Sequence, residues 1–272
     1  MLFHARAAAP PLRDLVDILW FAESNAMPHP KERLLPTGTM ELIVNLLEDV
    51  VYVYDRRDLR MEILPGAIVV GAASEFMVID TRNETCVLGV HFRPGGALPL
   101  LGELPAGEVR DQHVALAELW GAREANDLRV QLLAAPSTQE KFDVVERVLT
   151  ARLTRSRERQ AAVAHILQRI PRTRTITEAT RDVGWSQRRL IDAFSNEVGL
   201  TPKVYGRVMR FQRVLRRVHA HAQDDVDWAD IALACGYFDQ SHLVRDFRAI
   251  AGITPTDYLM RRTPHQNHVP ME

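Results

Sequence analysis

Cysteine, long apolar runs and secretion signals are scarce or missing in this chain of 272 residues. The two cysteines, Cys86 and Cys235, are far apart and have apolar or small neighbours, which favours buried thiols over a disulfide or a metal site. No apolar run reaches the roughly 18 residues that cross a bilayer, and the N-terminus lacks the apolar core of a signal peptide. We therefore expect a globular cytoplasmic protein that does not enter a membrane.

The common signatures of enzymes are also missing. Residues 93–96 (RPGG) are glycine-rich, but no Gly-Lys-Ser/Thr ending follows, which favours a strand-to-helix turn over a phosphate-binding loop. His91 has neither a His-x-His pair nor a nearby glutamate in the sequence, which favours a structural or pocket histidine over a metal ligand. No Gly-x-Ser-x-Gly turn surrounds Ser74 or Ser186. The sequence thus predicts no catalytic residue, no metal and no cofactor.

The net charge of −1 hides an asymmetry between the two halves of the chain. Residues 1–150 carry 14 Lys and Arg against 22 Asp and Glu, a net charge of −8, whereas residues 151–272 carry 20 against 13, a net charge of +7. Of those 20 basic residues, 19 are arginine, whose guanidinium binds phosphates and guanine edges in a fork. The pattern indicates an acidic folded half joined to a half that binds nucleic acid.

The first ~95 residues have the sequence pattern of a β-rich domain. Turn formers separate short β-branched or aromatic runs, namely ILWFAES, MELIVNLL, VVYVYD, AIVVGAA, FMVID and CVLGVHF. This spacing predicts a small sandwich or barrel. Helices are expected after it, the longest from Thr138 to about Arg155 with Ser137 as its cap.

A helix-turn-helix pattern appears in the second half. A short helix within TITEATRDVG ends at Gly184, where a reversal needs positive φ. Ser186 then caps the helix QRRLIDAFSNEVG, whose inward stripe is Leu190, Phe194 and Val198. Polar side chains are left on the outer face, as a recognition helix in a major groove requires.

The same pattern then returns. DWADIALACG ends at Gly236, and YFDQSHLVRDFRAIAG follows with Leu243, Phe247 and Ile250 on its inner face. The two units both close on glycine and Thr-Pro (EVGLTP and IAGITP), which marks an internal repeat. A continuous helix of roughly 19 residues connects them and spans about 28 Å, close to the ~34 Å repeat of B-DNA.

The stretch from about Arg157 to Arg262 resembles the DNA-binding domain of the AraC/XylS family. The most specific part is DWADIALACGYFDQSHLVRDFRAIAGITPTDYLMRR, and GWSQRRLIDAFSNEVGLTPKVYGRVMRFQRVL fits the first unit. The chain departs from the family at Glu178-Ala179-Thr180, where Leu-Ala is usual, and at Asp192, where a base- or phosphate-binding residue is expected. The resemblance implies a transcription regulator with two recognition helices. Their predicted DNA-binding residues are Ser186, Gln187, Arg188, Arg189, Asp192, Gln240, Ser241, His242 and Arg245.

The front half resembles the β-rich, cupin-like sensing domains of such regulators in LPTGTMELIVNL and LGVHFRPGGALPLLG. Its strands carry aromatic residues and a histidine that either line an apolar ligand pocket or fill a core: Trp20, Phe21, Tyr52, Tyr54, Phe76 and His91. The helix REANDLRVQLLAA offers a dimer seam through Leu128, Leu132 and Leu133.

The predicted fold class is a two-domain α+β protein. A β-rich barrel or sandwich with trailing helices is expected at residues 1–155, an all-α domain with two helix-turn-helix units at 156–263 and a disordered tail at 264–272. Promoter DNA is the predicted partner, while an effector molecule, RNA polymerase and a second copy of the chain stay open. The alternative function is a cupin-type enzyme or a DNA-repair fusion, which needs a metal triad or a reactive cysteine. Activation and repression are not distinguished.

Overall fold

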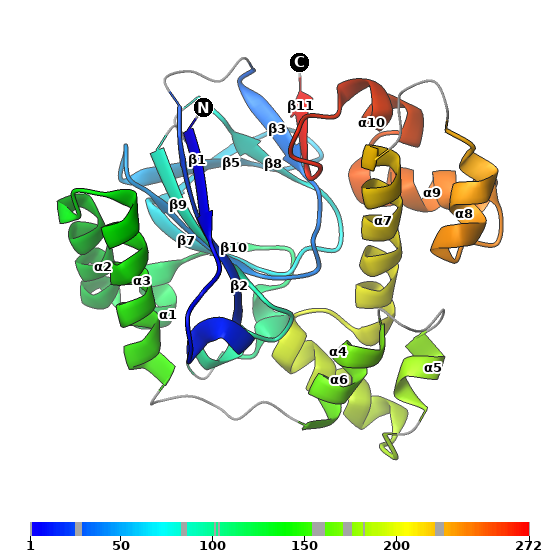
Figure 1. Cartoon of the computed structure of the whole chain (residues 1–272), viewed down its shortest axis with the longest axis horizontal. Helices are drawn as coiled ribbons and strands as arrows, with labels where there is room; N and C mark the ends of the chain where they lie inside the picture. The colour runs from blue at the N-terminus through cyan, green and yellow to red at the C-terminus, as the bar shows by residue number, and fades with distance from the viewer. Residues whose placement is uncertain are drawn as a thin grey trace.

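A β-rich N-terminal domain lies beside a helical C-terminal domain in the computed structural model (Figure 1). The structure describes residues 2–24, 29–82, 86–100, 102, 104–153, 161–170, 176–181, 183–220 and 226–271. This arrangement confirms the predicted two-domain fold class. The predicted domain boundary between residues 155 and 156 lies outside the described residues.

Two antiparallel sheets form the N-terminal domain. The first has the strand order β1-β2-β9-β4-β7-β10, and the second has the order β11-β3-β8-β5-β6. The strands are β1 (Leu2–Arg6), β2 (Val16–Glu23), β3 (Lys31–Leu34), β4 (Glu41–Asn45), β5 (Val50–Tyr54), β6 (Met61–Pro65), β7 (Ala67–Val70), β8 (Met77–Asp80), β9 (Cys86–Phe92), β10 (His113–Ala115) and β11 (His268–Met271).

Three helices follow β10, and seven more make up the C-terminal domain as far as it is described. They are α1 (Leu116–Trp120), α2 (Ala122–Ala134), α3 (Thr138–Leu153), α4 (Ala161–Arg169), α5 (Ile176–Thr180), α6 (Gln187–Val198), α7 (Pro202–Ala220), α8 (Trp228–Cys235), α9 (Gln240–Ala251) and α10 (Pro255–Arg261). The connecting helix α7 has the predicted length of 19 residues.

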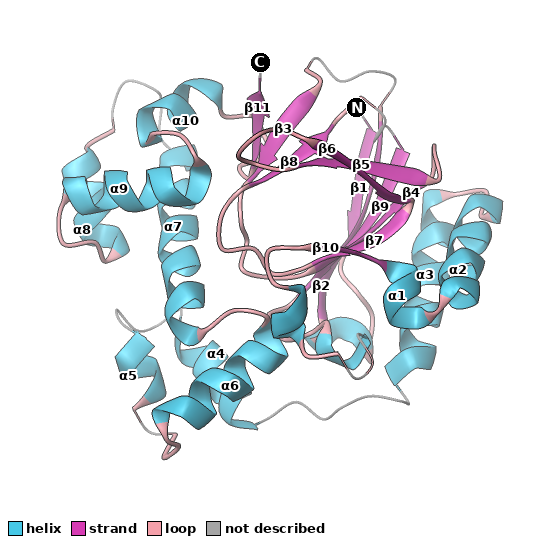
Figure 2. Cartoon of the chain, turned by 180° about the vertical axis from the view of Figure 1, so that it is seen from behind, coloured by secondary structure: helices cyan, strands magenta, loops and turns pink. Residues whose placement is uncertain are grey.

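The first sheet buries one face against α1, α2 and α3 (Figure 2). Because successive side chains of a strand point to opposite faces, Leu42 and Val44 of β4 and Leu88 and Val90 of β9 all enter this core. The same cluster continues into the C-terminal domain through Phe194 of α6. The first helix-turn-helix unit therefore shares a hydrophobic core with the N-terminal domain.

The C-terminal tail is ordered where the sequence predicts disorder. Residues 268–271 form β11, which pairs with β3 so that His268 lies opposite Leu34 and Met271 opposite Lys31. Val269 is completely buried. A polar sequence gave no local sign of a strand, but β3 would otherwise be an open sheet edge, and the tail satisfies its N–H and C=O groups.

The proposed dimer seam on α2 is largely used inside the monomer. Leu128 and Leu132 are buried in the core with α3, which leaves Leu133 as the exposed member of the predicted set. The seam prediction is wrong for those two leucines because α3 covers them. Dimerisation itself stays a prediction.

Candidate nucleic-acid interface and cavity

Local sequence signals define both ends of α6, the second helix of the first unit. The Ser186 hydroxyl accepts a hydrogen bond from the backbone N–H of Arg189 at 3.3 Å, as an N-cap residue does. Gly199 ends the helix in the left-handed conformation at φ +91°. Leu190 and Phe194 are buried, so the first turn presents its polar side chains to solvent.

The predicted DNA-binding residues of α6 are all exposed, namely Ser186, Gln187, Arg188, Arg189 and Asp192. Arg188 lies 3.9 Å from Asp192 through a nitrogen and a carboxylate oxygen, on side chains that are 93% and 63% exposed. The Arg189 guanidinium lies 4.3 Å from the centre of the Trp185 ring. An ion pair this exposed contributes little stability, so Arg188 is available to a phosphate or a base edge. Arg189 is exposed to solvent as well.

The second unit repeats this geometry in α9. Asp239 is the N-cap residue and accepts the backbone N–H of His242 at 2.6 Å. Gln240, Ser241 and Arg245 are exposed. His242 is half-buried, because its ring packs edge-on against Tyr237 with 5.2 Å between centroids. The imidazole is therefore held more firmly than the other predicted contact residues.

The match between the two units extends beyond the recognition helices. Helices α6 and α9 both have 12 residues and both end in a left-handed glycine. The threonine that follows caps the next helix in each unit: Thr201 accepts the N–H of Val204, and Thr254 accepts that of Asp257. The internal repeat predicted from the sequence is thus a structural repeat.

Two exposed apolar side chains beside the second recognition helix escaped the sequence analysis. Phe238 is 84% exposed immediately before the N-cap of α9, and Leu233 of α8 is 66% exposed. Single exposed apolar side chains are common on protein surfaces, and only a large contiguous patch marks a contact surface, so these two assign no partner by themselves. The signal available in the sequence was the aromatic pair at 237 and 238, of which only Tyr237 has room in the core.

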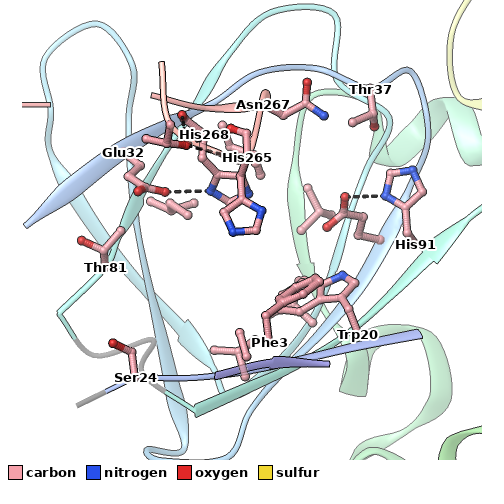
Figure 3. A pocket seen from close by; sticks show the side chains of 18 of the residues that line it. Phe3, Trp20, Ser24, Glu32, Thr37, Thr81, His91, His265, Asn267 and His268 are labelled. Atoms are coloured by element: carbon pink, nitrogen blue, oxygen red, sulfur yellow. Dashed lines mark hydrogen bonds and ion pairs between the residues drawn. The ribbon is translucent and has the colours of Figure 1, made fainter. Parts of the chain in front are cut away.

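A cavity of about 860 Å³ lies between the two sheets. Its apolar wall includes Trp20 and Phe3, whose rings are stacked at a centroid distance of 6.3 Å (Figure 3). Trp20 lies flat over the strand below it because Gly89 has no side chain: a Cβ there would be 2.1 Å from Cε2 of Trp20. The size and apolar lining are those of a small-molecule site.

His91 and Glu41 form a polar pair in the cavity wall. Nδ1 of His91 lies 2.8 Å from Oε1 of Glu41, and Nε2 lies 2.8 Å from the hydroxyl of Thr39. Burial acts to lower the pKa of His91, but the hydrogen bond and charge of Glu41 outweigh it and raise that pKa above its ordinary value. Sequence reasoning found no glutamate near His91 because Glu41 is 50 residues away.

The C-terminal tail closes the opposite side of the cavity. His268 of β11 lies 2.7 Å from a carboxylate oxygen of Glu32, and His29 contacts the other oxygen (Figure 3). Burial acts to raise the pKa of Glu32, but the hydrogen bonds and charges of His268 and His29 outweigh it and lower that pKa. Residues 263–268 of the tail all line the cavity.

Of the aromatic set predicted for a pocket, Trp20 and His91 line the cavity. Phe21 points to the opposite face of β2 and is buried in the helix-covered core. The Tyr54 hydroxyl donates to Asp80 at 2.8 Å on the outer face of the second sheet, and Phe76 packs against α9. Tyr52 also lies outside the cavity lining. Strand alternation places successive side chains on opposite faces of the sheet. The sequence did not show which of the two faces lines the cavity.

Among the described residues, no group of three or more His, Cys, Asp or Glu side chains is placed to hold a metal ion. Burial raises the pKa of both thiols, Cys86 and Cys235, which keeps them protonated and weakly nucleophilic at neutral pH. Among the residues that the structure describes, no helix has the length and apolarity to span a bilayer.

Comparisons with known families divide the chain as the structure does. Residues 4–115 match a domain of unknown function, DUF6597, and residues 179–261 match a helix-turn-helix domain. The C-terminal part of the chain thus contains a helix-turn-helix domain, in agreement with the resemblance of this part to the AraC/XylS family. A comparison of the sequence with curated proteins gives no match.

Several solved structures of ToxT from Vibrio cholerae are similar to this chain. An apo lysine-to-alanine variant is 12% identical, with a TM-score of 0.48 over 90% of this chain and 98% of that chain. ToxT bound to an unsaturated fatty acid is 10% identical, with a TM-score of 0.47 over 99% and 98% of the two chains.

One loop of the N-terminal domain contacts the ends of α6 and α9, the second helices of the two helix-turn-helix units. The loop is residues 71–76, between β7 and β8. A Cβ on Gly199, at the end of α6, would lie 3.0 Å from Cβ of Ala72. At the end of α9, the backbone N–H of Phe76 donates to the carbonyl of Ile250 at 2.8 Å. The 71–76 loop thus joins the two units through equivalent positions.

The connecting helix α7 is hydrogen-bonded to residues of the cavity wall. The side-chain amide of Gln212 on α7 donates to the carbonyl of Pro36 at 2.8 Å and to the side chain of Asn267 at 2.9 Å. Asn267 lines the cavity. A molecule in the cavity would therefore touch residues that hydrogen-bond to α7.

Proposed function

We propose that the protein is a sequence-specific transcription regulator that places α6 and α9 in successive major grooves of promoter DNA. The observation that carries this is the structural repeat: two capped 12-residue helices with exposed polar first turns, joined by a 19-residue helix. At 1.5 Å per residue α7 spans about 28 Å, close to the ~34 Å between successive major grooves on one face of B-DNA.

The residues that we assign to DNA lie in the first two turns of α6 and α9. On α6 and its cap they are Ser186, Gln187, Arg188, Arg189 and Asp192; on α9 they are Gln240, Ser241, His242 and Arg245. Arginine side chains suit guanine edges or phosphates, and Gln240 and His242 suit base edges. Asp192 can accept from cytosine N4 and, as a carboxylate, is repelled by phosphate.

We further propose that the cavity binds a small-molecule effector and that the 71–76 loop transmits its presence. Ile68 and Val70 of β7 and Ile79 of β8 line the cavity, and the loop joining these strands contacts both recognition helices. A shift of either strand would therefore alter the placement of α6 and α9 relative to each other. Because DNA fixes the spacing of its grooves, such a shift would change affinity.

The test is selection of bound sequences from a random DNA library by the full-length protein. We expect a bipartite site whose two elements are about one helical turn, roughly 10 base pairs, apart. A single element, or no enriched sequence at all, would contradict the arrangement of the two recognition helices. RNA polymerase and a second copy of the chain are further partners that this experiment does not require.

A further inference from the structure

The chemistry of the cavity wall specifies the charge of the molecule that it binds. Adjacent strands of the first sheet place two rows of side chains on the cavity face. One row runs His91, Glu41, Val70 and His113 across β9, β4, β7 and β10. The neighbouring row runs Trp20, Gly89, Ile43 and Ile68. Rows two residues apart are separated by about 7 Å, so an apolar strip lies directly beside a polar one.

Acidic groups outnumber permanent cations along the wall. The described lining includes three glutamates, Glu23, Glu32 and Glu41, and neither lysine nor arginine. The side chains of Glu32 and Glu41 are only 5% and 16% exposed. A buried anion is costly without a positive partner, and the described lining has no lysine or arginine that could pair with an anionic ligand.

The histidines of the wall provide no free positive charge, because His29 and His268 are paired with Glu32 and His91 is paired with Glu41. Both ring nitrogens of His91 already have partners, Glu41 and Thr39, which leaves no donor for a ligand. Burial lowers the pKa of His113 to about 4, so its imidazole is neutral at physiological pH. Burial, with the charge of His268, also lowers the pKa of His265.

Acceptors, in contrast, are free. Among the described residues, Oε1 of Glu41 is bonded to His91 while the second carboxylate oxygen has no hydrogen-bond partner. Nε2 of His113 and Nδ1 of His219 are buried ring nitrogens without a partner among the described residues, and both imidazoles line the cavity. A neutral imidazole nitrogen can accept a hydrogen bond. The same nitrogen donates in the other tautomer, so the second carboxylate oxygen of Glu41 is the group that specifically requires a donor.

We infer that the cavity binds an organic cation: an apolar, aromatic-sized body over Trp20 and Ile43 with a protonated amine at Glu41. The body would cover the apolar row, where the Trp20 and Phe3 rings also favour a nearby positive charge. The amine would donate to the free oxygen of Glu41, which is one row away. The inference rests on the proposed effector role of the cavity and adds the chemical class of the effector.

Three probes with one body and different head groups test the inference: biphenylmethylamine, biphenylmethanol and biphenylacetate, each titrated into the full-length protein by calorimetry. We expect the amine to bind at least about tenfold more tightly than the acetate, a difference of about 1.4 kcal/mol, with the alcohol between them. Equal affinities, or tighter binding of the acetate, would overturn the inference while leaving an effector cavity intact.

Variants locate the head group. Glu41→Gln removes the charge and keeps the shape, so it should weaken the amine about tenfold and leave the alcohol within about twofold. Glu62→Gln makes the same charge change on the exposed strand β6, outside the cavity lining, and should alter nothing. Equal weakening of all three probes by Glu41→Gln would contradict the amine–Glu41 contact. If none of the probes binds the unaltered protein, the effector role itself fails, and the inference with it.

Discussion

The ring of Phe76 occupies the space that a side chain on Gly252 would need. A Cβ on this glycine would lie 2.5 Å from Cε1 of Phe76, and Gly252 has φ +68° at the end of α9. Phe76 also donates its backbone N–H to Ile250, the residue two positions before that glycine. The absence of a side chain at one position thus fixes where the second recognition helix meets the N-terminal domain.

Gly252→Ala should therefore destabilise the protein for two reasons, the positive φ at this position and a clash with the Phe76 ring. An alanine at positive φ costs about 1 kcal/mol, and the clash with Phe76 adds to it, for a total of about 2 kcal/mol or more. The matched control is Gly184→Ala, because Gly184 has φ +69° with no atom within 4 Å of its Cβ position. Chemical denaturation of both variants provides the comparison. Equal losses in the free energy of unfolding would mean that the Phe76 ring does not clash with a side chain at position 252.

Arg188→Ala and Arg245→Ala should each weaken DNA binding by about 1–3 kcal/mol. If the side chain reads guanine, base preference relaxes at one position of one element, and the two variants affect different elements of the site. If it binds phosphate, the slope of log affinity against log salt falls by about 1 and preference is unchanged. Repeated site selection and salt titration distinguish these results.

The control for both arginines is Arg123→Ala, which changes a side chain of α2 that is 94% exposed. Helix α2 lies on the opposite side of the sheets from α8 and α9 (Figure 1). It should change neither affinity nor preference. Loss of affinity in this control equal to that of Arg188→Ala would show that only the overall charge of the protein matters.

His113 should make the protein less stable as the pH falls. Burial lowers its pKa from 6.5 to about 4 in the folded protein. Between these two pH values the imidazole is protonated in the unfolded chain but stays neutral in the folded protein. The free energy of unfolding falls through this range and the effect is complete below about pH 4. At about pH 5 the loss from this group is about 2 kcal/mol.

The measurement is urea denaturation of the unaltered protein and of His113→Leu at about pH 7.5 and about pH 5. Other titrating groups contribute to both proteins and cancel in the comparison. The variant should lose about 2 kcal/mol less than the unaltered protein on acidification. Parallel losses would show that the imidazole is not buried as neutral.

Removal of residues 264–272 should destabilise the N-terminal domain as well as the C-terminal one. The deletion exposes the edge of β3 and removes Val269, whose burial alone is worth about 1.5–3 kcal/mol. A lower thermal midpoint, with amides of β3 losing protection from hydrogen exchange, is the expected result. Unchanged protection in β3 would mean that β11 does not pair there.

Local signals in the sequence were sufficient for the helix-turn-helix units. The cap Ser186, the glycines that end α6, α8 and α9 and the apolar stripes act within a few residues of one another, so their consequences can be predicted along the chain. The length of α7 and the order of the two domains were predicted in the same way. The exposure of the polar side chains at the start of α6 and α9 was also predictable, because the apolar stripe of each helix faces the core and leaves the other positions on the outer face.

Tertiary structure alone decided the cavity and its connections. Alternation in a strand shows that there are two faces but not which face meets the helices, so Phe21 and Trp20, neighbours in sequence, were indistinguishable until the sheet was packed. Glu41 meets His91, and His268 meets Glu32, across 50 and 236 residues. These pairs depend on strand pairing between distant segments, which no local pattern encodes, and the tail gained its strand only because β3 offered an open edge.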